Sequence, residues 1–593
     1  MHLIKSVRLA AIALAWAGGS ALCWNGPLRA EPIVNATPAQ LVVNDVLGGT
    51  ASTPQTVTIA NGGSTGLSIQ SLTIVTIDGT PGQFQIASQP TLPATVAPGT
   101  SVSVGIVFNP TAAGPAIARL DIATDAPATP TASMSLQGLG TKGIGGNLEP
   151  SLQWIFDTYL IAVDVGDPDP AETDLAGSVP LGGEMSIQRF LKAGSGPVTV
   201  EPLAVFAPQS NSGLVFRVGH HPSGNPAAKS ELFTVADANH QTLAPPVTGK
   251  REFDPGVGSF GFYAILPFQG NREVFLEDGL NTFTDALPHH MRVYPLKKSD
   301  GTVELNAFVV ALEGITTSFD FQDLVFVVRN ARPIPPAHFS GGGLSNLLWR
   351  NGQTGANTLW TVQSDTLGSA ASFSAQAIAL PAVGDPNWKI VGTGDFNFDT
   401  KADILWRNTA TGANTVWLMN GTVLASTVAL PAVGDLGWHI GGTGDFDFDG
   451  SADILWRNHS TGANTVWLMN RTTFIASVPL PAVGDLAWQI GGTGDFDFDG
   501  RTDVLWRNTV TGVNSLWLMD QTTLKNTAAL PAVGLDWQIG GVGDYDADNR
   551  PDILWRNTAT GANAVWLMND TVLGVSATLP PVADSKWQIR GPR

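Results

Sequence analysis

The sequence has almost no cysteine, no long apolar run in its main part and little helical periodicity. Cys23 is the single cysteine, so no disulfide can form within the chain. After residue 30, no segment approaches the roughly eighteen apolar residues in a row that predict a membrane-spanning helix, so no membrane span is expected. Short runs of Val, Ile, Thr and Trp alternate with Gly, Pro, Asn and Asp. This pattern of strands and turns predicts an all-β protein.

The first thirty residues have the pattern of a secretory signal peptide. Basic residues precede the apolar stretch 9–22, and Ala30 is a small residue suited to cleavage. We therefore predict a signal peptide at residues 1–30 and an exported protein that is secreted or lies at the cell surface, with the periplasm as an alternative. Lipid attachment at Cys23 is less favoured, because Leu22 is too large for the usual lipoprotein signal.

The chain is acidic, with a formal net charge of −19, and loss of three basic residues with the signal peptide makes it −22. Binding to nucleic acid relies on basic side chains that neutralise phosphates, so we expect no nucleic-acid partner. Cleavage also removes the cysteine, so an exported chain without disulfides needs another means of stabilisation. The remaining residues, about 560, suggest three or four domains.

Residues 31–142 carry regularly spaced short strand patterns that favour a β-sandwich. The phrases VAPGTSVSVGIVFNPTAAG and LDIATDAPATPTASMSLQGLGT resemble the immunoglobulin-like choice-of-anchor D and ASH family. The resemblance implies a spacer or adhesive module near the cell envelope, without catalytic residues.

Residues 145–335 predict a second, less repetitive β-sandwich-like domain of uncertain family. Its paired histidines, His220-His221 and His289-His290, could bind a transition metal, but we interpret them as surface-loop residues. Near its end, Asp320 and Asp323 precede the apolar run LVFVV. This arrangement resembles bacterial extracellular domains of the DUF4114 type and implies a calcium site at the two aspartates. Solvated carboxylates at a strand end are the alternative.

Residues 340–593 contain a repeat of about fifty residues. Trp-Arg-Asn recurs at spacings of 57, 50, 50 and 49 residues, at Trp349, Trp406, Trp456, Trp506 and Trp555. Further tryptophans recur at Trp360, Trp417, Trp467, Trp517 and Trp566, and at Trp388, Trp438, Trp488, Trp537 and Trp587. A fixed period without a helical pattern predicts propeller blades or a β-solenoid, and each unit contains four candidate strands. We interpret the tryptophans as core residues, with sugar-stacking platforms as the alternative.

An aspartate-rich loop connects the first candidate strand to the second in four units. The form Asp-x-Asp-x-Asp-Gly-x-x-Asp resembles the FG-GAP/VCBS repeat family, and the resemblance implies calcium-binding loops on the blades of a β-propeller. The matching sets are Asp395, Asn397, Asp399 and Asp403; Asp445, Asp447, Asp449 and Asp453; Asp495, Asp497, Asp499 and Asp503; and Asp544, Asp546, Asp548 and Asp552. Calcium takes six to eight oxygen ligands, so it would turn mutually repelling carboxylates into ligands. We predict about four structural Ca²⁺ sites.

Two of these loops depart from the pattern. Thr400 and Asn549 replace the glycine of the turn, and Asn397 removes one charge, so we expect weaker binding in the two outer loops. An EF-hand is excluded, because its glutamate at position 12 and its flanking helices are missing.

The two ends of the repeat complete each other. The first unit starts at Ser340 without a Trp-x-Ile strand, and the chain ends at Trp587 with such a strand and nothing after it. We therefore predict a five-bladed propeller in which the C-terminal strand pairs beside Leu347–Arg350. An open array that completes itself by oligomerising is the alternative, so the oligomeric state stays open.

These features favour a non-enzymatic binding or adhesion protein, whose ligand would be a glycan or another surface molecule. Repeated sites would raise avidity. A purely architectural envelope or matrix protein is the alternative. A polysaccharide-active enzyme is less favoured, because catalysis needs a distinct acid and base, whereas nearly every carboxylate of the repeats recurs.

Overall fold

The computed structural model describes residues 31–145, 148–166, 182–185, 187–207, 215–256, 258–267, 270–282, 289–314, 321–333, 339, 344–364, 373–397, 401–447, 451–546 and 548–591. The predicted signal peptide, Asp320, Asp399 and Asp449 lie outside these residues. The chain forms two compact units, of which the first contains the residues up to Ala162 together with 242–244 and 297–303, and the second contains the rest. Within the described ranges, no helix has the length and apolar character needed to cross a membrane.

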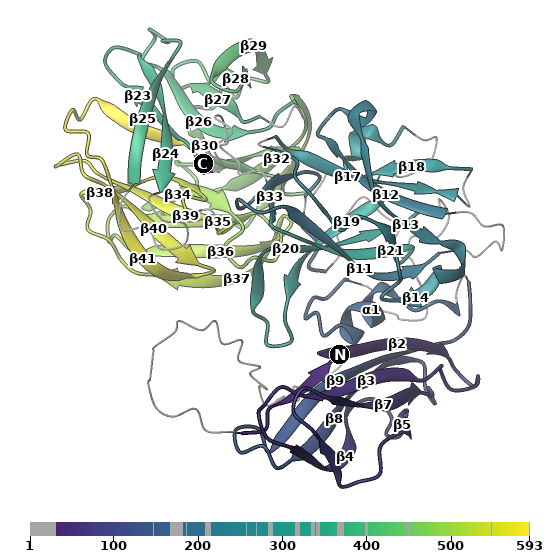
Figure 1. Ribbon diagram of the computed structural model, residues 1–593. Coiled ribbons are helices and arrows are strands. Elements are labelled where there is room, and N and C mark those ends of the chain that lie inside the picture. The colour runs from purple at the N-terminus through teal and green to yellow at the C-terminus, as the bar shows by residue number, and fades with distance from the viewer. Residues whose placement is uncertain are drawn as a thin grey trace. The chain divides into compact units, whose positions relative to one another are not determined.

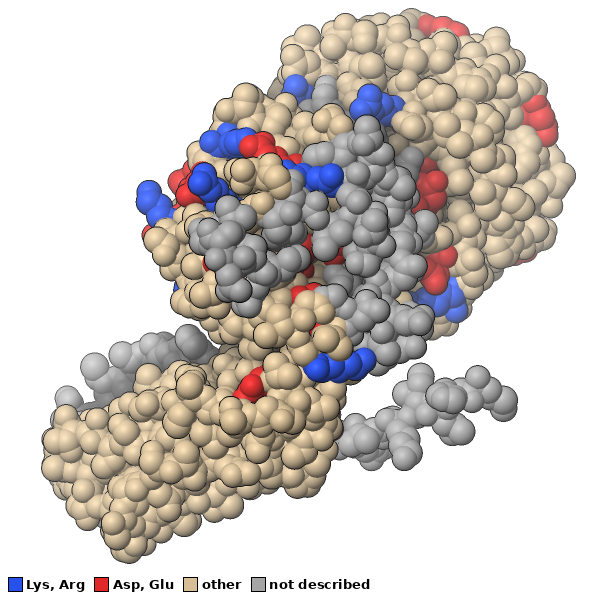
Figure 2. Space-filling model, turned by 90° about the vertical axis from the view of Figure 1, so that its right-hand side faces the viewer, with Lys and Arg blue, Asp and Glu red and all other residues tan. Residues whose placement is uncertain are grey.

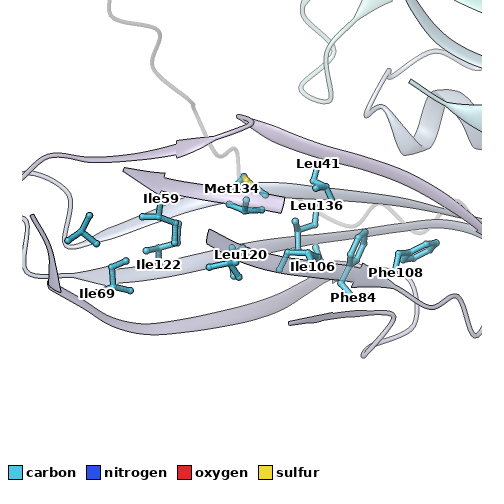
Figure 3. Close-up of a cluster of buried hydrophobic side chains, with 14 of the residues drawn as sticks. Leu41, Ile59, Ile69, Phe84, Ile106, Phe108, Leu120, Ile122, Met134 and Leu136 are labelled. Atoms are coloured by element: carbon cyan, nitrogen blue, oxygen red, sulfur yellow. The ribbon is translucent and has the colours of Figure 1, made fainter. Parts of the chain in front are cut away.

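The first unit contains a sandwich of two β-sheets. Its strands are β1 (Val34–Thr37), β2 (Gln40–Val46), β3 (Gln55–Asn61), β4 (Leu67–Asp78), β5 (Phe84–Ser88), β6 (Ala94–Val96), β7 (Ser101–Phe108), β8 (Gly114–Thr124) and β9 (Thr131–Thr141). The sheet orders are β1-β3-β7-β5 and β2-β9-β8-β4-β6, with β2 parallel to β9. Side chains from both sheets, among them Ile59, Ile106, Leu120 and Leu136, form one fully buried core (Figure 3).

A short helix and a distant segment complete this unit. Helix α1 (Leu152–Thr158) begins after Ser151, whose side-chain oxygen accepts a hydrogen bond from the Trp154 N–H at 3.3 Å. The Asn44 side-chain oxygen accepts a hydrogen bond from the Leu243 N–H at 2.9 Å. The first unit therefore extends beyond the strands of the sandwich.

The second unit begins with two more packed sheets, although residues 242–243, 297 and 303 of their strands are counted in the first unit. Their strands are β10 (Phe190–Lys192), β11 (Val198–Phe206), β12 (Val215–Pro222), β13 (Ser230–Ala236), β14 (Gln241–Leu243), β15 (Thr248–Gly249), β16 (Glu252–Phe253), β17 (Phe260–Leu266), β18 (Arg272–Phe275), β19 (Met291–Lys297), β20 (Val303–Leu312), β21 (Leu324–Arg329) and β22 (Ala331–Pro333). Short 3₁₀ helices occupy Pro226–Ala228, Asp237–Asn239 and Asp278–Leu280. One sheet has the order β15-β13-β12-β17-β10-β22 and the other β14-β11-β21-β20-β19. Phe190 and Phe262 of the first contact Phe308 and Phe326 of the second, with ring centroids 5.2–5.4 Å apart.

The remainder of the second unit forms five four-stranded antiparallel sheets, counted over the described residues. Their strands are β23 (Leu347–Asn351), β24 (Asn357–Ser364), β25 (Phe373–Leu380), β26 (Trp388–Gly394), β27 (Asp403–Asn408), β28 (Asn414–Asn420), β29 (Val423–Leu430), β30 (Trp438–Gly444), β31 (Asp453–Asn458), β32 (Asn464–Asn470), β33 (Thr473–Leu480), β34 (Trp488–Gly494), β35 (Asp503–Asn508), β36 (Asn514–Asp520), β37 (Thr523–Leu530), β38 (Trp537–Gly543), β39 (Asp552–Asn557), β40 (Asn563–Asn569), β41 (Val572–Leu579) and β42 (Trp587–Gly591). The sheets lie around a common centre (Figure 1), and β26, β30, β34, β38 and β42 contact one another in a closed sequence. The predicted all-β, propeller-like architecture is confirmed.

Strand β42 completes the first of these sheets. Trp349 of β23 pairs with Ile589 of β42, and Asn351 pairs with Trp587. Trp349 also shares a buried cluster with Leu554 and Val565 of the last sheet. The predicted pairing of the C-terminal strand beside Leu347–Arg350 is therefore confirmed. This pairing covers an edge of β23 that would otherwise be exposed.

The triplet tryptophans and arginines connect neighbouring sheets. Each tryptophan of a Trp-Arg-Asn triplet is at most 2% exposed, which confirms its place in the core. The guanidinium carbon of Arg407 lies 4.9 Å from the ring centroid of Trp456 in the next sheet. The same contact recurs from sheet to sheet, and Arg556 of the last sheet lies over Trp349 of the first at 5.0 Å. Among the other ten tryptophans of the repeat, Trp417 is buried and nine are partly exposed, so their role as sugar platforms stays a prediction.

Charge is sparse on the surface. On the face drawn in Figure 2, acidic and basic side chains form small separate groups, and uncharged residues cover most of the described surface. This distribution agrees with a sequence in which 14% of the residues are charged. The aspartates of the repeats therefore stand out as local concentrations of charge.

Candidate metal sites in the acidic loops

The acidic loops lie at equivalent positions in four successive sheets. Gly444 at the end of β30 pairs with Asp453 at the start of β31, so the loop between them begins and ends at one edge of the sheet. The same pairing joins Gly394 with Asp403, Gly494 with Asp503, and Gly543 with Asp552. Each loop thus connects the innermost strand of a sheet to the next strand outward.

The last aspartate of each loop is fully buried and accepts hydrogen bonds at both oxygens. Asp453 Oδ2 accepts from the Phe446 N–H and Oδ1 from the Met469 N–H, both at 2.8 Å. The equivalent bonds at Asp403, Asp503 and Asp552 measure 2.8–2.9 Å. This carboxylate holds the start of the loop against the third strand. Phe446 lies in the buried core between this sheet and the next.

Three of the loops bring carboxylates together. One oxygen from each of three aspartates lies within 4.8 Å of the others in the sets Asp445, Asp447 and Asp453; Asp495, Asp497 and Asp503; and Asp544, Asp546 and Asp548. Oxygen ligands lie about 2.3–2.6 Å from a calcium ion, so two ligands of one ion are at most about 5 Å apart. The clusters therefore fit calcium in ligand type and in spacing.

The electrostatics of these clusters favour a cation. Burial, followed by the charges of Asp499 and Asp497, raises the pKa of Asp495 well above its ordinary value. Burial raises the pKa of Asp453 and of Asp503 to about 9, and neighbouring aspartates add to the rise. A divalent ion between the carboxylates would offset both the repulsion and the lost hydration.

The turn in these loops does not require glycine. Gly500 has a φ of +87°, and Asn549 at the equivalent position has a φ of +69°. Their N–H groups donate to the first aspartate of each loop, at 2.9 Å to Asp495 and 3.2 Å to Asp544. Asparagine adopts the left-handed region more readily than most residues. The substitution at Asn549 therefore preserves the turn and gives no conformational reason for weaker metal binding in that loop.

Basic side chains contact the acidic loops. Arg189 Nη1 lies 3.3 Å from Asp395 Oδ2, and Arg189 Nε lies 3.2 Å from Glu277 Oε2. Lys525 contacts Asp499 at 3.2 Å. Sequence analysis missed Arg189, because it lies 206 residues before Asp395 and no local pattern marks it.

The first acidic loop differs from the other three. The Asn397 N–H donates to Asp395 Oδ1 at 3.3 Å, and Asp403 is buried as its counterparts are. Asp399 and Thr400 lie outside the described residues, and the described ones form no three-carboxylate cluster in this loop. In this loop a protein cation, Arg189, contacts the first aspartate, whereas Lys525 and Arg550 contact the third aspartate of their loops, Asp499 and Asp548.

Asp323 is not a solvated strand-end residue. It is 3% exposed, and its Oδ2 accepts a hydrogen bond from the Gly314 N–H at 2.8 Å. The alternative interpretation of a solvated carboxylate is therefore wrong for Asp323, since burial and this bond hold it inside the protein. No metal-sized cluster of His, Cys, Asp or Glu includes it among the residues that the structure describes. The partner proposed for it, Asp320, lies outside those residues, so the site there stays a prediction.

The paired histidines do not lie on surface loops, so that interpretation is wrong. His221 and His290 are fully buried. His289 Nε2 lies 2.8 Å from Glu184 Oε1, and its Nδ1 lies 3.0 Å from Asp278 Oδ2. Burial lowers the pKa of His289, but the two carboxylates outweigh it and raise the pKa to about 10. A histidine held as a cation in this way is a charge partner and not a metal ligand.

Comparison with known proteins supports the repeat. Residues 445–506 match the family model of the FG-GAP-like repeat. A search of the curated proteins gives no match.

Similar solved structures share only a low overall likeness with this chain. They include a Porphyromonas gingivalis protein of unknown function (17% identity, TM-score 0.16, 18% of this chain and 48% of that chain). Another is the ASH/PapD-like domain 7 of human CEP192 (16% identity, TM-score 0.17, 21% and 96%). A third is the Dos1 propeller (9% identity, TM-score 0.21, 51% and 88%). The alignment thus spans about half of the Porphyromonas protein, and scores this low carry no argument about function.

Proposed function

We propose that the chain is an exported, non-enzymatic binding protein whose β-propeller is stabilised by calcium and offers its surface to a glycan or another cell-surface ligand. The observation that carries the proposal is the recurrence of three-aspartate clusters at one position in successive sheets. The match of residues 445–506 to an FG-GAP-like repeat supports the same conclusion. Ions at these positions would supply the stabilisation that a chain without disulfides lacks.

A binding role agrees better with these loops than catalysis does. Acid–base catalysis requires two groups with different environments. In the acidic loops, each buried aspartate has counterparts with the same two backbone partners. The carboxylates therefore form a repeated structural set and not a distinct pair.

Calorimetric titration of the calcium-free protein with CaCl₂ tests the metal proposal. We expect three or four ions per chain with dissociation constants on the order of 10⁻⁴ M, as in other extracellular calcium modules. Asp497→Asn should remove or weaken one site, whereas Asp121→Asn, in the sandwich of the first unit, should leave all sites intact. Absence of calcium binding would overturn the proposal.

A further inference from the structure

The ring of sheets contains a second candidate site, at its centre. A cavity of about 320 Å³ is lined by the innermost strands β26, β30, β34 and β38, together with Arg590 of β42. It includes the segment 439–441, next to Trp438, whereas the acidic loop begins after Gly444 at the other end of the same strand. The cavity and the acidic loops therefore lie at opposite ends of the inner strands. Its size is within the range of small-ligand pockets.

The lining of this cavity is basic, although the chain as a whole is acidic. The chain has 50 acidic and 31 basic residues, yet the cavity is lined by one lysine, four arginines, two histidines and no aspartate or glutamate. Three of the arginines, Arg407, Arg457 and Arg507, belong to the Trp-Arg-Asn triplets. Their Nη atoms are bound to backbone carbonyls and asparagine side chains, so they contribute positive potential within a fixed framework.

The other basic residues are departures from the repeat. Lys389 and His439 occupy a position at which the later sheets carry Gln489 and Gln538. His459 replaces the threonine found at Thr409 and Thr509, and Arg590 replaces a glycine found at Gly441, Gly491 and Gly540. All four departures introduce a basic or imidazole side chain into the same cavity. Repetition of the fold does not explain them, because the sheets with Gln, Thr and Gly form the same strands.

Arg590 is the most informative departure. The equivalent glycines lie where a Cβ atom would approach an isoleucine of the next sheet, to 2.8 Å at Gly441 and 2.5 Å at Gly491. Arg590 instead adds a guanidinium group to the lining of the cavity, and its Nη2 donates a hydrogen bond to Gln588 Oε1. Its Nε is buried and has no hydrogen-bond partner among the described residues. An unpaired buried donor is costly, so a ligand that accepts from it would gain affinity.

The neighbouring groups are consistent with a positive potential in the cavity. Burial, then the charges of Arg590 and Arg350, lowers the pKa of Lys389. The rings of His439 and His459 stack with centroids 3.9 Å apart. Burial, His439 and Arg457 lower the pKa of His459 to about 4. A bound anion would stabilise the protonated forms of Lys389 and His459, whose pKa values are lowered.

We propose that the axial cavity binds a small acidic sugar, with the carboxylate held by Arg590 and Lys389 and the hydroxyl groups held by Gln489 and Gln538. Guanidinium groups suit carboxylates because they can donate two parallel hydrogen bonds. The amides of Gln489 and Gln538 both donate and accept, as sugar hydroxyls require. The basic residues that depart from the repeat come from β42, β26, β30 and the residue after β31, whereas the glutamines come from β34 and β38. The additional cationic groups thus lie on one side of the cavity and the glutamines on the other. This inference rests on the proposed binding function and names a ligand class for it.

Titration calorimetry on the full chain with 1 mM calcium tests the proposal, with glucuronate as the probe and glucose and sodium sulfate as comparisons. We expect glucuronate to bind, and glucose and sulfate to bind at least about tenfold more weakly, because each lacks one of the two kinds of group. Equal binding of glucose would overturn the anionic assignment. Equal binding of sulfate would overturn the assignment of a sugar.

Variants that restore the repeat keep the test independent of folding. Arg590→Gly, Lys389→Gln and His459→Thr each install the residue that other sheets carry, so the fold should persist. Arg590→Gly and Lys389→Gln should weaken glucuronate binding about tenfold or more. Lys586→Ala removes an exposed charge outside the cavity and should leave binding unchanged. Unaltered binding in both cavity variants would overturn the proposal.

Two further readouts separate this proposal from the calcium proposal. Bound glucuronate should raise the pKa of His459 in an NMR titration, which a purely structural role for His459 would not do. The cavity variants should bind as many calcium ions as the parent chain. If calcium binds but glucuronate does not, the axial site is wrong and the calcium-stabilised propeller stands. If glucuronate binds but calcium does not, the axial site stands and the calcium-stabilised propeller is wrong.

Discussion

The sandwich of the first unit and the ring of the second use the same kind of strand but are stabilised differently. In the sandwich, two sheets share one core, which includes Val57, Leu67 and Ile122. In the ring, each sheet packs against two neighbours, and separate cores lie between successive sheets. No three-carboxylate cluster occurs among the described residues of the sandwich. Each sheet of the ring therefore contributes to two cores and needs a neighbour on each side, whereas the two sheets of the sandwich share a single core. Three of the ring sheets also carry a cluster of carboxylates in a loop.

Removal of the last strand should produce the largest difference between the two regions. Deleting residues 585–593 exposes one edge of β23 and leaves β26 and β38 without the strand that lies between them. We expect the ring to lose cooperative stability as a whole, by about 5 kcal/mol or more. Scanning calorimetry of the full and shortened chains should show the loss in the transition of the ring and not in that of the sandwich. A ring transition that keeps its temperature and enthalpy would contradict closure by β42.

Removal of calcium should have the next largest effect. A site with a dissociation constant of about 0.1 mM contributes about 1.4 kcal/mol at about 1 mM calcium, so four sites contribute about 6 kcal/mol. EDTA should lower the melting temperature of the ring and leave the sandwich nearly unchanged. Magnesium at the same concentration should restore less of the stability, because it requires a tighter octahedral arrangement of ligands. Equal shifts in both transitions would show that the acidic loops are not responsible.

A single buried aspartate should matter more than a surface aspartate. Asp453→Ala removes two hydrogen bonds to buried backbone N–H groups and one candidate ligand, and should destabilise the ring by about 2–5 kcal/mol. Asp121→Ala in the sandwich removes an ion pair with Arg119 at the surface and should cost less than about 1 kcal/mol. Urea unfolding of both variants would measure the difference. Similar losses at both sites would mean that the bonds of Asp453 do not stabilise the loop.

The pH dependence of the stability of the ring should change its direction or weaken when calcium is present. Burial raises the pKa of Asp453 and Asp503 to about 9, against 3.8 in the unfolded chain. The metal-free folded ring therefore binds more protons than the unfolded chain between these values, and its stability should fall as pH rises through this range. With calcium the ionised form is favoured, so the trend should weaken or reverse. Melting temperatures at pH 5 and pH 8, with and without calcium, would test this sign. A metal-free ring that is more stable at pH 8 would contradict it.

The sequence was informative where structure repeats, including at the two ends of the repeat, and uninformative where segments without a shared pattern meet. The tryptophan period and the unmatched ends predicted the ring and the pairing of Trp587 with the first sheet, because each unit repeats the same local strand pattern. The aspartate spacing predicted, for the same reason, that carboxylates converge in the acidic loops, and three of the four loops form such clusters among the described residues. The burial of His221 and His290 was missed, because it depends on how two sheets pack. The Arg189 contact with Asp395 was missed because no short motif encodes a pairing of side chains so far apart.

The composite sheet also determines when the ring can form. Strand β23 is among the first parts of the repeat to leave the ribosome, and its partner β42 follows more than two hundred residues later. More than two hundred residues must therefore be present before this pair can form, and joining such distant segments carries an entropic cost and slows folding. Until then, the exposed edges of the early sheets are open to pairing with other chains. Closure by β42 therefore comes late, after every other strand of the ring is present.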